Sequence, residues 1–107
     1  MNLIALELFR AVNAWNDLGY GDFGLHYVRT KENREVDFLL SENRRPFLLV
    51  EAKRGDTSPN PNLLHFQNVL GVPAVQLLAA GSGFKRIQND RGSLLIAPAS
   101  WWLPNLP

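Results

Sequence analysis

Apolar residues recur at helical spacing along the first part of the chain. They lie three or four positions apart, and such positions share one side of an α-helix. Gly19 comes shortly after the last of them and is a typical helix stop. The pattern predicts an amphipathic helix over Asn2–Asp17, with an apolar face formed by Ile4, Leu8, Val12 and Trp15.

Short runs rich in branched and aromatic residues follow this helix and predict strands. Leu25–Arg29 and Arg34–Leu40 flank the polar turn Thr30–Asn33, and Phe47–Lys53 comes after the polar segment Ser41–Pro46. Apolar runs separated by short polar segments are typical of hairpins. The first half of the chain therefore predicts three strands, and the last two of them form a hairpin.

The second half alternates between helix and strand signals. The loop Arg54–Asn62 is too rich in proline to be helical. Asn62–Leu70 predicts a short helix that ends at Gly71, and Val72–Ala79 predicts a buried strand. Because a helix lies in the connection, this strand is expected to run parallel to an earlier one.

The end of the chain predicts a second hairpin, with strands Phe84–Gln88 and Ser93–Ile96, followed by a tail over Ala97–Pro107 that is irregular or forms a short helix. The core order is thus α-β-β-β-α-β plus a C-terminal hairpin. This order predicts an α/β sandwich with a mixed central sheet flanked by helices, in a single domain over residues 1–107.

Composition excludes several classes of protein. The chain is 46% hydrophobic and 20% charged with a net charge of +1, which argues against disorder and fibrous repeats. No apolar run reaches the roughly 20 residues that span a bilayer. With no secretory signal in the pattern, we expect a cytoplasmic location and no membrane partner. The chain has no cysteine, which excludes disulfides and thiolate zinc sites.

The predicted hairpin carries charges where buried strands usually have none. Side chains on a strand alternate between its two faces, so Leu39 opposite Leu49 sets the register of the whole pair. Asp37 then faces Glu51 with Cβ atoms roughly 4.5–5.5 Å apart. Two carboxylates that close repel each other unless a positive charge lies between them. The next pair in the same register is Glu35 and Lys53.

Three explanations fit these charges. The first is an exposed sheet face with cross-strand ion pairs such as Glu35 to Lys53, in which an arginine such as Arg34 could neutralise Asp37. The second is a general acid and base of the glycosidase kind, which usually needs a long sugar-binding cleft. The third is a metal-dependent phosphodiesterase, because Mg²⁺ binds through one or two carboxylates together with water and phosphate oxygens. Spacing alone leaves the first and third explanations open.

The same residues resemble a known family. An acidic residue on one strand and Glu-Ala-Lys on the next, between two helices, resemble the PD-(D/E)XK phosphodiesterase superfamily, which has the restriction-endonuclease-like fold. The sequence is more closely similar to the domain of unknown function at the C-terminal end of bacterial and archaeal AAA+ ATPases. That similarity covers most of Met1–Leu78 and is specific in Thr30–Phe38 and Leu49–Lys53.

The resemblance implies roles for the matching positions. Asp37 and Glu51 would be metal ligands for Mg²⁺ or Mn²⁺, and Lys53 would be the catalytic lysine. Glu7, on the first helix, would be an additional ligand, and Gln67, on the second, would face the site. The chain departs from the motif in one place, where Val36 replaces its proline, and it contains no GxxxxGK[ST] loop of its own.

These observations lead to a functional hypothesis with one alternative. The chain is expected to be a metal-dependent nuclease that hydrolyses phosphodiester bonds of nucleic acid, with DNA as the expected partner. Eight of its eleven basic residues are arginine, and the pairs Arg44–Arg45 and Lys85–Arg86 and the loop Arg54–Asn62 are candidates for phosphate contacts. The alternative is a catalytically silent module that binds DNA, an ATPase or a second copy of itself.

Other candidates have simpler explanations. His26 and His65 have no second ligand at metal-binding spacing, so a surface or capping role is expected for His65. Among the aromatic residues, Tyr27 and Phe66 are expected in the core. Trp101 and Trp102 are adjacent and cannot both point inward on an extended segment, so one of them is a candidate for an interface.

Overall fold

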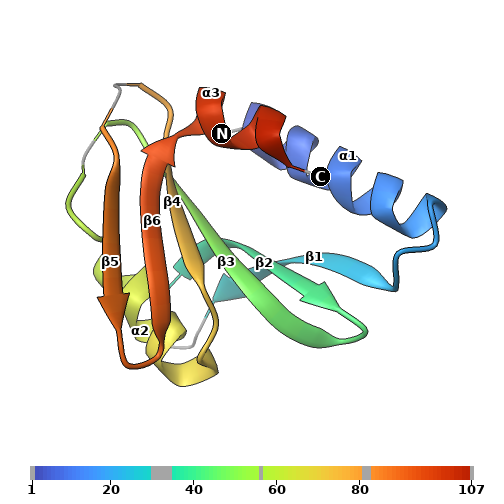
Figure 1. Ribbon diagram of the computed structural model, residues 1–107, viewed down its shortest axis with the longest axis horizontal. Helices are drawn as coiled ribbons and strands as arrows, with labels where there is room; N and C mark the ends of the chain where they lie inside the picture. Colours follow the sequence, from blue (N-terminus) through green and yellow to red (C-terminus); the bar gives the residue numbers. More distant parts are fainter. Residues whose placement is uncertain (1, 30–34, 56, 81–82, 107) are drawn as a thin grey trace.

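A six-stranded mixed sheet forms the centre of the protein, with helices on both of its faces (Figure 1). The computed structural model describes residues 2–29, 35–55, 57–80 and 83–106, and the predicted turn Thr30–Asn33 lies outside them, as does Arg34. The sheet order is β1-β2-β3-β4-β6-β5. The elements are α1 (Asn2–Asp17), β1 (Phe23–Arg29), β2 (Glu35–Glu42), β3 (Arg45–Lys53), α2 (Pro61–Leu70), β4 (Ala74–Leu78), β5 (Lys85–Asn89), β6 (Gly92–Pro98), α3 (Ala99–Trp102) and the 3₁₀ turn η1 (Leu103–Asn105).

Strand directions agree with the sequence pattern. β1, β2 and β3 pair antiparallel, and Leu39 lies opposite Leu49 as expected. β4 runs parallel to β3, because α2 carries the chain back across the sheet between them. β4 is also parallel to β6, which pairs antiparallel with β5. The structure therefore confirms an α/β protein with a mixed sheet and the predicted element order.

The β2–β3 hairpin is tighter than the predicted polar segment Ser41–Pro46. Its strands extend until Glu42 pairs with Arg45, which leaves a two-residue turn. Both turn residues have positive φ, 52° at Asn43 and 68° at Arg44. This is the backbone of a type I′ turn, whose twist matches that of the flanking strands.

Two hydrophobic clusters lie on opposite faces of the sheet. α1 covers one face with Ile4, Leu8, Val12 and Trp15, which pack on strand residues such as Val50 and Leu77. The tail returns to the same face, with Trp102 and Leu103 at the edge of this cluster. α2 covers the other face with Leu63 and Phe66, against Leu49 and Ile96.

A β-bulge interrupts the alternation of β2. His26 pairs with Leu39 and Val28 pairs with Val36, so Tyr27 alone on β1 faces both Asp37 and Phe38 on β2. The extra residue changes the faces on which the following side chains lie. As a result, Val36 packs in the α2 cluster and Phe38 in the α1 cluster, although they are two residues apart.

The start of α2 differs from the prediction. Asn60, rather than Asn62, is the N-cap, and its side chain accepts hydrogen bonds from the backbone N–H groups of Asn62 and Leu63. Pro61 is inside the helix, because the first helical position needs no N–H donor and suits the fixed φ of proline. The predicted stop at Gly71 is confirmed, with φ 67°.

The predictions for the aromatic residues have mixed outcomes. Phe66 is buried as expected, but the core prediction for Tyr27 is wrong, because its side chain on the edge strand β1 is 80% exposed. Of the adjacent tryptophans, Trp102 packs on the α1 cluster and Trp101 is 48% exposed. No helix within the described residues is long and apolar enough to cross a membrane.

Candidate functional site

Asp37 and Glu51 lie together at the point where the ladder between β2 and β3 ends. The last backbone pair in this direction is Phe38 with Val50. Beyond it the two carboxylates replace the ladder, because Glu51 Oε1 accepts from the Asp37 N–H at 3.0 Å and Asp37 Oδ2 accepts from the Ala52 N–H at 3.0 Å. The structure thus brings the two predicted carboxylates into one site.

The β-bulge creates this arrangement. Asp37 is one of the two bulge residues on β2, so its backbone N–H is not engaged in a regular ladder with β3. Bulges are enriched beside functional sites, where they redirect a side chain or end a pairing. Here the bulge leaves one N–H on each strand to bind a carboxylate of the other strand.

Asn60 is the third member of the site. Its Nδ2 donates to Glu51 Oε2 at 2.6 Å, while its Oδ1 caps α2. Both Glu51 oxygens are therefore held, one from β2 and one from the start of α2. Among the described residues no N–H group donates to Asp37 Oδ1, so this oxygen can bind a ligand.

Gln76, on the central strand β4, holds Asn60 in position. It is fully buried on β4 and lies beside Glu51 in the parallel register. Gln76 Oε1 accepts from the Asn60 N–H at 2.9 Å, and its Nε2 donates to the Ser58 carbonyl at 2.9 Å. The amide fixes the loop before α2 on the sheet, and this loop places Asn60 against Glu51.

Burial and the neighbouring carboxylate dominate the electrostatics of the site. The pKa of Glu51 is raised from 4.5 to about 7, first by burial and also by the charge of Asp37 and a hydrogen bond with its carboxyl group. The hydrogen bond from the Asp37 N–H and the charge of Lys53 act in the opposite direction without cancelling the rise. A buried carboxyl group whose charged form is disfavoured, beside a second, half-buried carboxylate, is a good environment for a divalent cation.

Lys53 lies at the end of β3 on the same face as Glu51, two residues further along the strand. Its charge lowers the pKa of Glu51, so it is close enough to act on the site through space. Among the described residues, however, neither Asp37 nor Glu51 forms an ion pair with it or with any other base. Within the described part of the chain, no ion pair engages its ammonium group.

Two residues that the resemblance assigned to the site lie elsewhere. Glu7 is on α1, which covers the opposite face of the sheet, and it pairs with Arg10 at 3.3 Å. Gln67 is buried under the second hairpin, where its amide binds the Ser93 carbonyl at 2.8 Å and the Asn89 side chain at 3.1 Å. Within the described part of the chain no three His, Cys, Asp or Glu residues form a group that could hold a metal ion.

The expected ion pair between Glu35 and Lys53 is replaced by another. Glu35 pairs with Arg29, its neighbour across β1 and β2. The β2–β3 ladder does not continue to Glu35, because it ends at Phe38 and Val50. Arg34, a candidate to neutralise Asp37, lies outside the described residues.

Sequence reasoning missed Asn60 and Gln76. Gln76 had a visible signal, since it is the polar residue in the middle of an otherwise apolar strand. Asn60 had a weaker one, because Asn before Pro is a common start for a helix. Its contact with Glu51 depends on how α2 packs on the sheet, which no local pattern shows.

The comparisons with known proteins leave the family of this chain open. No family model, curated protein or solved structure matches it.

Proposed function

We propose that this chain is a metal-dependent nuclease domain with the restriction-endonuclease-like fold, and that it hydrolyses phosphodiester bonds of DNA. The observation that carries the proposal is the joining of Asp37 and Glu51 in one partly buried site, without an ion-pair partner among the described residues. A sheet that used these carboxylates only for stability would be expected to pair them with a base.

The donor set suits a hard divalent cation. Asp37 and Glu51 would hold it, and Mg²⁺ commonly uses only one or two protein carboxylates. Each carboxylate oxygen has two lone pairs, so the hydrogen bonds to the backbone and to Asn60 leave room for a metal ligand. The chemistry that such an ion supplies is polarisation of a phosphate oxygen and activation of water.

The chain's own residues supply orientation and charge. Asn60 and the Asp37 N–H fix the Glu51 carboxylate, so little reorganisation is needed when a ligand binds. Lys53 places a positive charge on the same face, where it can stabilise negative charge that develops on the phosphoryl oxygens. The element order from α1 to β4 supports the specific fold, since it is the order that the resemblance implies.

A catalytically silent module that binds DNA, an ATPase or a second copy is the second candidate. Two observations favour it. Glu7 and Gln67 do not join the carboxylates, and Asp37 and Glu51 also accept hydrogen bonds from backbone N–H groups. Under this candidate the acidic pair closes the end of the β2–β3 ladder, and function resides in a surface.

A cleavage assay separates the two candidates. The protein is incubated with supercoiled plasmid and with labelled single- and double-stranded oligonucleotides, in Mg²⁺, in Mn²⁺ and in EDTA. The variants are Asp37→Asn and Lys53→Met, with Asp17→Asn and Arg10→Met as matched changes at exposed positions.

The nuclease proposal predicts metal-dependent cutting that falls by at least about 100-fold in Asp37→Asn and Lys53→Met, because each removes a charge that acts in the transition state. The control variants should keep wild-type activity. Binding of DNA without cutting under either metal would refute the nuclease proposal and favour the silent module.

A further inference from the structure

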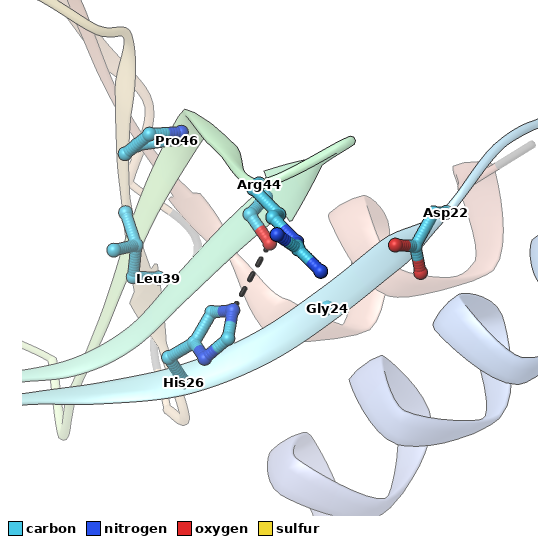
Figure 2. A pocket seen from close by; sticks show the side chains of 7 residues that line it. Asp22, Gly24, His26, Leu39, Arg44 and Pro46 are labelled. Carbon is cyan, nitrogen blue, oxygen red and sulfur yellow. Dashed lines mark hydrogen bonds between the residues drawn. The ribbon is translucent and has the colours of Figure 1, made fainter.

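A pocket lined by both polar and apolar residues lies at the far end of β2, near the tip of the β2–β3 hairpin. It has a volume of about 380 Å³. Figure 2 shows the Arg44 side chain over the strand pair, between the His26 imidazole and the Asp22 carboxylate. The lining residues are Asp22, Gly24, His26, Leu39, Ser41, Arg44 and Pro46.

The polar groups of this pocket are held in place. His26 Nε2 and Ser41 Oγ share a hydrogen bond of 3.0 Å (Figure 2). Gly24 makes room for them, because a Cβ there would lie 2.7 Å from His26 Nε2 and 2.8 Å from Ser41 Oγ. The hairpin tip is also fixed, since Asn43 exchanges hydrogen bonds with Asp22 at 2.6 Å and 3.1 Å.

Arg44 is in this pocket at a conformational cost. Its φ of 68° is a left-handed conformation that glycine adopts freely and that other L-residues disfavour. Glycine is the residue that type I′ turns prefer at this position. Arg44 thus places a guanidinium at a position where the backbone favours glycine, and among the described residues this guanidinium forms no ion pair.

We propose that this pocket binds a backbone phosphate of a nucleic-acid strand. Arg44 would donate to the phosphate oxygens, and the Ser41 hydroxyl can add a donor when it accepts from His26 Nε2. Leu39 and Pro46 offer an apolar wall for the sugar. The Asp22 carboxylate across the pocket disfavours a free phosphate dianion more than a phosphodiester, which carries a single charge.

The position of the pocket links it to the candidate site, and this part rests on the proposed function. Ser41 is four residues beyond Asp37 on β2, which is about 13 Å at roughly 3.3 Å per residue. A nucleic-acid strand that follows β2 would therefore bring two nearby phosphates of the same strand to the two sites. Binding of one phosphate at Arg44 would then fix which phosphodiester of the nucleic-acid strand lies at Asp37.

The test measures binding in EDTA, so that it does not depend on cleavage. Fluorescence anisotropy with a labelled single-stranded 12-mer gives the Kd at several salt concentrations, with inorganic phosphate as a competitor. The variants are Arg44→Gly and Ser41→Ala. The matched control is Arg45→Ala, which removes the same charge from the neighbouring exposed residue outside this pocket.

Arg44→Gly should weaken binding about tenfold at low salt and reduce the slope of log K against log salt by about 0.7, as expected for one lost phosphate contact. The same variant should raise Tm by roughly 3–6 °C, because glycine relieves the turn. Ser41→Ala should weaken binding less, and Arg45→Ala should have a smaller effect than Arg44→Gly.

Equal losses in Arg44→Gly and Arg45→Ala would overturn the proposal, since general surface charge would then explain binding. Competition by inorganic phosphate below millimolar concentrations would also overturn it, because the pocket would then be a site for the free anion. Cutting that is lost in Asp37→Asn while binding persists would support the nuclease proposal and leave the pocket proposal standing. A protein that never cuts would refute only the nuclease proposal, because the pocket is tested by binding in EDTA.

Discussion

The raised pKa of Glu51 makes a prediction about stability that does not depend on any enzyme assay. In the folded protein this carboxyl group holds its proton up to about pH 7, whereas its ordinary pKa is 4.5. Between these values the folded state binds more protons than the unfolded state, so stability falls as the pH rises. The contribution of this proton to the free energy of unfolding is fully present below pH 4.5 and is lost as the pH rises through about 7.

The size of this effect follows from the two pKa values. A rise from 4.5 to about 7 corresponds to about 3 kcal/mol. Glu51 is only 7% exposed, so solvent screening reduces this value little. Glu51→Gln removes the titration but leaves either the Asp37 N–H or the Asn60 amide without an acceptor, which costs about 1–3 kcal/mol at every pH.

The free energies of unfolding of the wild type and Glu51→Gln should therefore converge or cross between pH 4.5 and pH 8. At low pH the variant is the less stable protein, and at pH 8 the difference has moved by about 3 kcal/mol in its favour. Urea unfolding at a series of pH values measures this difference. Other titrating groups act on both proteins alike and cancel, and Glu42→Gln, at the exposed end of the neighbouring strand β2, is the control.

Metal ions should remove the effect. At pH 8, Mg²⁺ or Mn²⁺ at 100 times its Kd would stabilise the wild type by about 2.7 kcal/mol, and it would stabilise Glu51→Gln less. A stability difference that stays constant with pH would refute the buried-carboxylate reasoning. A wild type that gains on the variant as the pH rises would show that ionised Glu51 is neutralised by a base.

The remaining predictions concern the residues that hold Glu51. Asn60→Asp keeps a good helix cap but places a second carboxylate against Glu51 Oε2. In metal-free buffer, urea unfolding should therefore show a free energy of unfolding that is lower by about 1–3 kcal/mol at pH 8 and by less at pH 5. Equal stability of the variant and the wild type at pH 8 would contradict the assigned contact. Gln76→Leu fits an apolar strand but leaves the Asn60 N–H and the Ser58 carbonyl without their partner, so it should lower the free energy of unfolding by about 2–4 kcal/mol. The control Gln88→Leu, on the exposed second hairpin, should change it by less than about 0.5 kcal/mol. A neutral Gln76→Leu would mean that the loop before α2 does not depend on this amide.

Hydrophobic periodicity alone determined most of the architecture. α1 spans the predicted Asn2–Asp17, and the register of Leu39 with Leu49 follows from strands whose side chains alternate with a period of two. That register also brings Asp37 and Glu51 together. These features are local or depend on one pair of neighbouring strands, so the sequence carries them directly.

Only the tertiary structure decided which helix covers which face of the sheet. α1 lies across the sheet from Glu51 and α2 lies on the same side, so Asn60 contacts the site and Glu7 does not. Gln67 points to the second hairpin for the same reason. The face that each helix covers depends on packing between segments far apart in the sequence. The residue pattern along one helix does not predict it.

The bulge at Asp37, the pKa of Glu51 and the pocket of Arg44 belong to the same class. Each depends on several segments at once. The pairing of β1 with β2 places the bulge, and the burial of Glu51 in the folded chain raises its pKa. The Asn43–Arg44 turn brings a guanidinium into the pocket of the His26–Ser41 pair. The sequence by itself determined which residues could carry the chemistry. The packing of the helices and the hairpin determined which of them meet, because distance and burial are properties of the folded chain.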